Sequence, residues 1–276
     1  MARTGGWAAA AGFGVTNRTP RAYSPGVSTS RPLPPGRRLV NDFLNAARTT
    51  RLITFARAID VSEIAALRAR MRPKPAWAVI FMKAYAAVAA RTPELRQAVM
   101  GFPAARLVES PHNIGMLVVP RVVNNERCIL LGRFRSPESM PLPALQSRHD
   151  YFHTAPVGEI RQFRHQLRFA ALPGFLRRFL FWSACEAVGP WRARTIGTFG
   201  ITISRLRKST LSNIIAPWTV AIGVDLDANR GAATTVLTFD HRVFDGLLAV
   251  ETMSALVREL RGPITREMRN LASRGG

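Results

Sequence analysis

Acidic residues are scarce in this chain of 276 residues, where 17 Asp and Glu stand against 39 Lys and Arg and give a formal net charge of +22. Lysine is scarce as well, since it occurs only at Lys74, Lys83 and Lys208, so arginine supplies nearly all the positive charge. The charge is spread along the chain, without a basic block interleaved with aromatic residues and without zinc-finger spacing. We therefore expect a surface that attracts acidic partners and phosphates, and we do not expect a dedicated nucleic-acid-binding protein.

Cysteine is nearly absent, and the only two thiols are Cys128 and Cys185. Their spacing excludes a disulfide framework and a cysteine-based zinc site, so we expect buried free thiols and a cytoplasmic, reducing location. His149 and His153 are four residues apart and could share a helical face as metal ligands. Two ligands without a nearby third are weak evidence, and no metal is predicted.

The first 41 residues contain no Asp or Glu, and the stretch from Ser24 to Pro35 is dense in Pro, Ser and Gly. This composition predicts a disordered basic N-terminal tail over residues 1–36. An organellar transit peptide is the alternative that the sequence leaves open. The apolar run from Gly5 to Val15 is too short and too rich in Ala and Gly to span a membrane.

Hydrophobic periodicity after the tail predicts interleaved helices and strands. The expected helices cover residues 37–47, 60–71, 77–91 and 247–260, with a capping box of Asp60 and Glu63 opening the second and Pro263 following the last. The expected strands cover residues 52–59, two strands within 114–134, and a hairpin of 219–225 with 232–239, while 143–165 is mixed helix and loop. Without strict βαβ repetition, this order predicts an α/β fold, a two-layer sandwich on a mixed β-sheet, with a C-terminal tail over residues 264–276.

The segment from Leu172 to Val188 is strongly apolar but is interrupted by Arg177 and Arg178. It is interpreted as a core helix or a subunit contact. An amphipathic helix that rests on a membrane or a partner is the alternative.

The segment from Leu237 to Gly246 carries the clearest chemical signal. A strand-like alternation ends on His241, and a helical run begins just after Asp245 and Gly246. Imidazole titrates close to physiological pH, so a fixed histidine can accept a proton from a thiol or an alcohol and return it later. Gly246 suggests a positive φ angle or a close approach of the backbone. Taken alone, the pattern also fits a structural histidine in a strand-to-helix turn.

The run Asp240-His-Arg-Val-Phe-Asp-Gly246 resembles the active-site signature of the acyltransferase core of 2-oxo acid dehydrogenase complexes, a family related to chloramphenicol acetyltransferase. Gly197 to Ser204 and Asn213 to Val224 resemble that family's Thr-Ile-Ser strand and Ile-Ile-x-Pro segment, in the same order. Weaker similarity extends over most of residues 37 to 262. The resemblance implies a chloramphenicol acetyltransferase-like fold and an acyltransferase catalytic domain over residues 37–263.

The resemblance also implies roles for individual residues. His241 would act as the general base, Ser204 would donate a hydrogen bond to the developing oxyanion, and Asp245 would form a structural ion pair with Arg38 or Arg37. The substrate would be acyl-CoA, with an unknown acceptor and no covalent acyl-enzyme. The active site would lie between subunits of a homotrimer, with His and Ser from different chains. Since no lipoyl-type domain precedes the core, this chain is not expected to carry its own lipoyl group.

The sequence departs from the family between Met116 and Pro120, which is shorter than usual, and at Arg205-Leu-Arg207 after the strand serine. Arg205, Arg207 and Lys208 could contact coenzyme phosphates or form a solvated basic turn. Two other functions stay open: a non-catalytic oligomeric scaffold that binds a partner protein or a membrane surface, and a small-molecule O-acetyltransferase. The sequence does not identify the acyl group, the acceptor or the size of the assembly.

Overall fold

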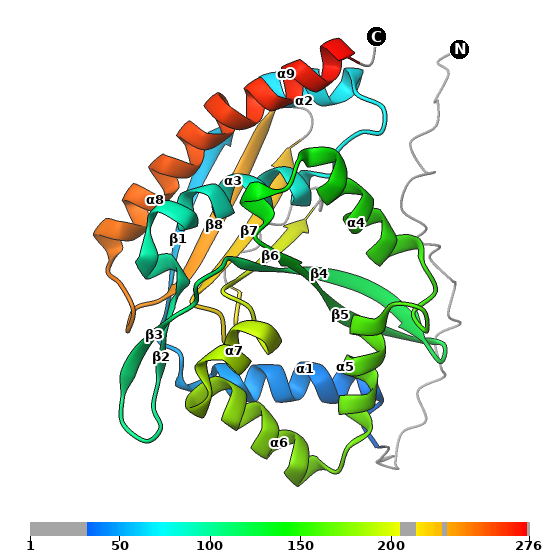
Figure 1. The fold of residues 1–276 in the computed structure, drawn as a ribbon, viewed down its shortest axis with the longest axis vertical. Coiled ribbons are helices and arrows are strands. Elements are labelled where there is room, and N and C mark those ends of the chain that lie inside the picture. Colours follow the sequence, from blue (N-terminus) through cyan, green and yellow to red (C-terminus); the bar gives the residue numbers. More distant parts are fainter. Residues whose placement is uncertain (1–31, 205–213, 228–230, 275–276) are drawn as a thin grey trace, which may run out of the picture. The chain divides into compact units, whose positions relative to one another are not determined.

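A six-stranded mixed sheet with the strand order β1-β8-β7-β6-β4-β5 forms the centre of the fold (Figure 1). The computed structural model describes residues 32–204, 214–227 and 231–274. The strands of the large sheet are β1 (Leu52–Asp60), β4 (Ile114–Val123), β5 (Glu126–Arg135), β6 (Phe199–Ser204), β7 (Val220–Asp227) and β8 (Ala232–Asp240). The β4–β6 and β6–β7 pairs are parallel and the other pairs are antiparallel, so the predicted mixed sheet is confirmed. A separate hairpin consists of β2 (Gln97–Met100) and β3 (Arg106–Glu109).

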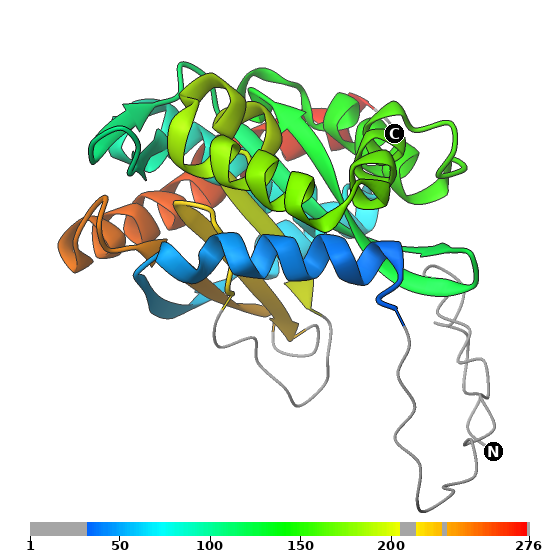
Figure 2. The same ribbon diagram turned by 90° about the horizontal axis from the view of Figure 1, so that it is seen from below.

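The helices cover both faces of this sheet (Figures 1 and 2). They are α1 (Pro35–Ala46), α2 (Ser62–Arg70), α3 (Trp77–Arg91), α4 (Leu142–Thr154), α5 (Arg161–Ala171), α6 (Gly174–Trp182), α7 (Gly189–Thr195), α8 (Gly246–Glu259) and α9 (Thr265–Arg274). Helix α3 is buried around most of its circumference and packs with α8 in the main core. Because successive strand residues point to opposite faces, Leu117 joins the main core while Met116 joins a second cluster. That second cluster packs against Phe43 of α1 and Phe181 of α6.

Most of the predicted elements form where the sequence placed them. Helix α3 and the hairpin of β7 with β8 are confirmed, as are two strands within residues 114–134. The capping box at α2 is wrong. The Asp60 Oδ1 atom accepts a hydrogen bond from the Ser62 backbone N–H at 2.9 Å, whereas Glu63 pairs with Arg269 of α9 and does not reach back to cap its own helix.

The predicted end of the last helix before Pro263 is also wrong, and so is the C-terminal tail over its described residues. Helix α8 continues through a π-helical turn at Leu260–Ile264 into α9. The wider turn accommodates Pro263, which has no N–H to donate, because the Leu260 carbonyl accepts from the Thr265 backbone N–H and from its hydroxyl at 2.7 Å. Met268 of α9 is fully buried, so the helix belongs to the folded unit.

The apolar segment from Leu172 to Val188 forms α6 followed by a π-helical turn at Ser183–Ala187. No residue of α6 itself is buried, and Phe175 and Phe179 are 75% and 60% exposed. The core-helix interpretation is therefore wrong for α6 and holds only for Ser183 to Cys185 in the turn. Among the described residues, no helix is both long enough and apolar enough to cross a membrane.

Replacing Met268 with Ala tests whether α9 is part of the core. Removing a fully buried methionine side chain leaves a cavity, so we expect Met268→Ala to lower the free energy of unfolding by about 2–5 kcal/mol. The matched control is Asn270→Ala, an exposed position on the same helix, which should change it by less than about 0.5 kcal/mol. Denaturant unfolding gives both values. If both changes had equally small effects, the result would support the predicted C-terminal tail outside the core.

Candidate active site

His241 follows directly on β8 and is held by two hydrogen bonds. Its backbone N–H donates to the Arg51 carbonyl at 2.8 Å, and its ring Nδ1 lies 3.0 Å from the Phe244 carbonyl oxygen. Because a carbonyl oxygen can only accept, Nδ1 must carry the proton in this contact. A neutral ring then keeps its lone pair on Nε2, and the side chain is exposed. This arrangement suits a general base that acts outside its own protomer's core.

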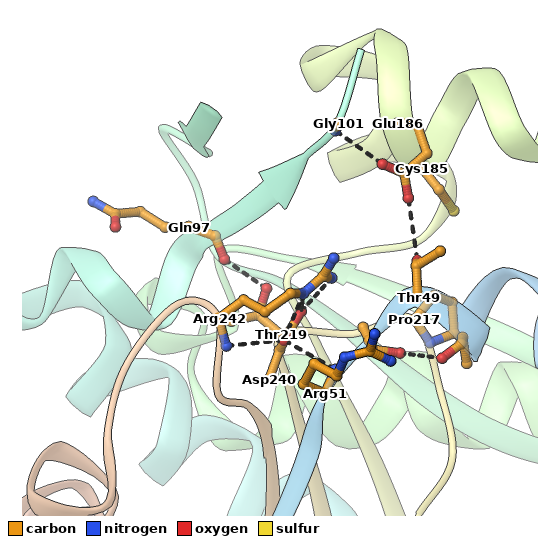
Figure 3. Close-up of polar contacts among 12 residues, drawn as sticks. Thr49, Arg51, Gln97, Gly101, Cys185, Glu186, Pro217, Thr219, Asp240 and Arg242 are labelled. Carbon is orange, nitrogen blue, oxygen red and sulfur yellow. Dashed lines mark hydrogen bonds and ion pairs between the residues drawn. The ribbon is translucent and has the colours of Figure 1, made fainter. Parts of the chain in front are cut away.

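Asp240 and Arg242 lock the backbone on either side of His241. Asp240 is 1% exposed, and its carboxylate accepts from Arg242 Nε at 2.9 Å and from Arg242 Nη2 at 2.6 Å. It also accepts from the Arg51 backbone N–H at 3.3 Å, which ties the turn to the start of β1 (Figure 3). The hydrogen bonds to Asp240 raise the pKa of Arg242. This bidentate pair was not predicted, although the opposite charges of Asp240 and Arg242 stand only two residues apart in the sequence.

Asp245 plays a different part from the one predicted. Its Oδ1 accepts from the Leu248 backbone N–H at 3.1 Å, so it is the N-cap of α8. Neither Arg37 nor Arg38 pairs with it among the described residues of one chain, and Arg38 Nε instead donates to the Leu33 carbonyl at 2.6 Å. This corrects the expected ion pair at the protomer level.

The sheet order explains that correction. The start of α1 lies against β5, because a Cβ added to Gly36 would come within 2.2 Å of the Cys128 Cβ. Strand β5 is four strands away from β8. At a spacing of about 4.8 Å per strand, β5, against which α1 begins, lies roughly 19 Å from β8, which leads to Asp245.

Gly246 does not have the backbone role that was predicted. It is not among the described glycines with a positive φ, which are Gly197 and Gly231, and a Cβ added to it would meet no atom within 4 Å. The residue is simply the first of α8, after the capping Asp245. The protomer alone therefore gives no reason for glycine at this position.

Ser204 is buried at the end of β6, but it is far from His241 within one protomer. It pairs in register with Asp225 of β7, which pairs with Thr234 near the beginning of β8. His241 follows the other end of β8, seven residues after Thr234. A strand rises about 3.3 Å per residue, so the two residues lie at opposite ends of the sheet, roughly 23 Å apart along the strand direction. Arg205, Arg207 and Lys208 lie outside the described residues.

The remaining candidate residues do not form a second reactive centre. His149 and His153 share a face of α4 with ring centroids 4.4 Å apart, and burial together with His149 lowers the pKa of His153 to about 4. Within the described ranges, no group of three or more His, Cys, Asp or Glu residues is arranged to hold a metal ion. Cys128 and Cys185 are free and buried, as predicted. Burial raises the pKa of Cys185 to about 11, so its thiol stays protonated at neutral pH.

Solved structures of acyltransferase cores have the same arrangement of strands and helices. One of them is a probable dihydrolipoamide acetyltransferase from Listeria monocytogenes 4b F2365. The match covers 85% of this chain and 94% of that chain, with 14% identity and a TM-score of 0.60. Another is the dihydrolipoamide acetyltransferase of Azotobacter vinelandii, where the match covers 88% of this chain and 97% of that chain, with 14% identity and a TM-score of 0.60. This chain has the fold of those catalytic cores.

A truncated catalytic core of the 2-oxoacid dehydrogenase multienzyme complex from Thermoplasma acidophilum gives the same result, with 13% identity, a TM-score of 0.61, and coverage of 86% of this chain and 99% of its own. No protein-family model and no curated protein matches the sequence. The likeness therefore lies in the fold, and it confirms the fold that the three sequence blocks implied.

Replacing Arg242 with Met tests whether the Asp240–Arg242 ion pair holds the turn at His241. The change leaves the buried Asp240 carboxylate without its bidentate partner, and we expect it to lower the free energy of unfolding by about 2–3 kcal/mol. The loss is smaller than for a fully buried pair because Arg242 is partly exposed. Arg242→Lys restores the charge without the two parallel hydrogen bonds and should lie between Met and the wild type. Denaturant unfolding measures all three proteins. A loss of less than about 0.5 kcal/mol in the Met variant would show that the pair does not hold the turn.

Proposed function

We propose that this chain is a CoA-dependent acyltransferase of the 2-oxo acid dehydrogenase acyltransferase type, with His241 as its general base. The observation that carries the proposal is the 3.0 Å contact between His241 Nδ1 and the Phe244 carbonyl oxygen. Among the described residues, this contact occupies Nδ1 and leaves Nε2 for an acceptor thiol. The mechanism of the Azotobacter enzyme was investigated at a serine, a histidine and an asparagine, and this chain has a serine and a histidine in the matching sequence blocks. The free, buried thiols support a cytoplasmic location.

The reaction transfers an acyl group from one thioester to an acceptor thiol. Nε2 of His241 removes the thiol proton while the sulfur attacks the thioester carbonyl, and the carbonyl oxygen becomes negatively charged. When the tetrahedral intermediate collapses, the carbon–sulfur bond to coenzyme A breaks, and the imidazolium returns the proton to the departing thiolate. No side chain is acylated on this route. The Asp240–Arg242 pair and the Asp245 cap act as positioning residues that keep the imidazole in place.

The separation of His241 from Ser204 supports a site shared between protomers. We propose a homotrimer in which Ser204 of one protomer donates a hydrogen bond to the oxyanion that forms beside His241 of the next. The roughly 23 Å between them along the strand direction supports this arrangement, because His241 and Ser204 of one protomer are too far apart to act on the same carbonyl group. The basic surface of a chain with net charge +22 would attract the phosphates of coenzyme A.

Replacing His241 with Ala removes the proposed base. We expect thiol release, measured with dihydrolipoamide as acceptor and the acyl-CoA that the wild type uses best among acetyl-CoA and longer-chain acyl-CoAs, to fall by about 10²–10⁴-fold, which is the usual contribution of general-base catalysis. The thermal unfolding midpoint and the mass of the assembly should stay the same, because the side chain is exposed. Unchanged turnover would reject His241 as the base. Transfer to a small alcohol in place of the thiol, measured with the wild type, would point to an O-acyltransferase.

Mixing two inactive variants tests the shared site. We expect Ser204→Ala to lower kcat by about 10²–10³-fold, as the loss of one oxyanion donor does. After subunit exchange between His241→Ala and Ser204→Ala proteins, some interfaces combine an intact His241 with an intact Ser204, so activity should return. Native mass spectrometry confirms the exchange. Exchange without any recovered turnover would contradict a site between protomers.

A further inference from the structure

A hollow with a volume of about 490 Å³ lies between α1, α6 and the π-helical turn that follows α6. It has the size of a small-molecule site, since such sites enclose about 300–1,000 Å³. Its apolar walls are Ala46 of α1, Phe181 and Trp182 of α6, Cys185 of the turn, and Phe102 after β2. Nothing in the proposed mechanism uses this hollow.

The acidic groups in the wall already have partners. Asp42 is 4% exposed, and its carboxylate accepts from Arg177 Nε at 2.6 Å. Glu186 accepts from the Gly101 backbone N–H at 2.9 Å and from the Thr49 hydroxyl at 3.3 Å (Figure 3). Arg177 neutralises Asp42, and two neutral donors satisfy Glu186, which keeps its charge. Apart from these two carboxylates, the hollow presents mainly carbon and sulfur to a ligand. Arg178 is the exposed cation in its lining.

Two large aromatic side chains at the hollow remain open to solvent. Phe102 is 53% exposed and Trp182 is 44% exposed, and their ring centroids lie 5.5 Å apart. Phe179 continues the aromatic surface, with its ring centroid 6.2 Å from that of Trp182. A contiguous exposed aromatic surface next to a concave apolar wall is typical of a site that buries an apolar ligand.

The hollow lies near the proposed general base of the same protomer. Thr49, in its lining, is two residues before Arg51, whose carbonyl accepts the backbone N–H of His241 at 2.8 Å. Two Cα–Cα steps and one hydrogen-bonded strand pair add up to at most roughly 13 Å between the Thr49 and His241 Cα atoms. An extended chain that begins at the base can therefore reach the hollow.

We propose that this hollow binds the apolar acyl chain of a thioester substrate, so that the transferred group is a fatty acyl chain and not acetyl. The proposal rests on the proposed function for the reaction itself, but the hollow's affinity for an alkyl chain is independent of turnover. It also accounts for the divergent helix α6, whose Phe181 and Trp182 supply one wall.

Isothermal titration calorimetry with the full chain tests the proposal with three probes: acetyl-CoA, dodecanoyl-CoA and free dodecanoate. We expect dodecanoyl-CoA to bind at least about tenfold more tightly than acetyl-CoA, because burial of only two methylene groups has that effect. Ala46→Phe fills the hollow with a ring and should remove this preference. Phe102→Ser changes an exposed wall residue without touching the core and should reduce it.

The matched control is Ala144→Phe, which places the same ring on an exposed position of α4 and should keep the wild-type preference. Equal affinity for acetyl-CoA and dodecanoyl-CoA in the wild type, or a preference that survives Ala46→Phe, would overturn the proposal. Dodecanoate binding that Ala46→Phe abolishes, in a protein that shows no acyl transfer, would support the hollow and reject the proposed function. If no probe binds and Ala46→Phe dissociates the assembly, the hollow is instead a contact between copies of the chain.

Discussion

The position of the His241 imidazole depends on the register of β8 and on the contacts of Asp240, the last residue of that strand. Strand β8 pairs with β1 on one side and β7 on the other, with Asp240 opposite Leu52 and Phe239 opposite Val220. A shift of one residue would move the buried Leu237 and Phe239 to the other face, so packing fixes the register. The Asp240–Arg242 pair then stops the strand, and His241 is the first residue beyond the sheet.

The strand order accounts for what one protomer can and cannot assemble. It places Arg51, at the start of the neighbouring β1, beside the His241 turn, whereas Arg38 lies with the far edge strand. In this order β6 and β8 run in opposite directions, so Ser204, at the end of β6, and His241, just after β8, lie at opposite ends of the strands. A reaction that needs both groups therefore needs two protomers, and the fold explains why oligomerisation and catalysis would be linked.

Local sequence patterns predicted most helices and strands correctly. The predictions were wrong where contacts between residues distant in the sequence determine the structure. The apolar run of α3, the hairpin of β7 with β8 and the turn at His241 follow from periodicity and from residue type, and the structure confirms them. The continuation past Pro263 depends on Thr265 bonding to Leu260 and on Met268 entering the core. The pairing of Asp42 with Arg177 joins residues far apart in sequence. No pattern in a single sequence specifies such partners, which is why the hollow beside α6 was not foreseen.

The central claim is that Nδ1 of His241 donates to the Phe244 carbonyl, so that Nε2 is the nitrogen that faces the acceptor thiol. Nitrogen-15 NMR of the histidine-labelled protein, assigned by comparison with His241→Ala, measures this most directly. The account predicts that the neutral form of the His241 ring carries its proton on Nδ1 and not on Nε2. A ring with its proton on Nε2 would point the wrong nitrogen at the acceptor thiol and would contradict the account.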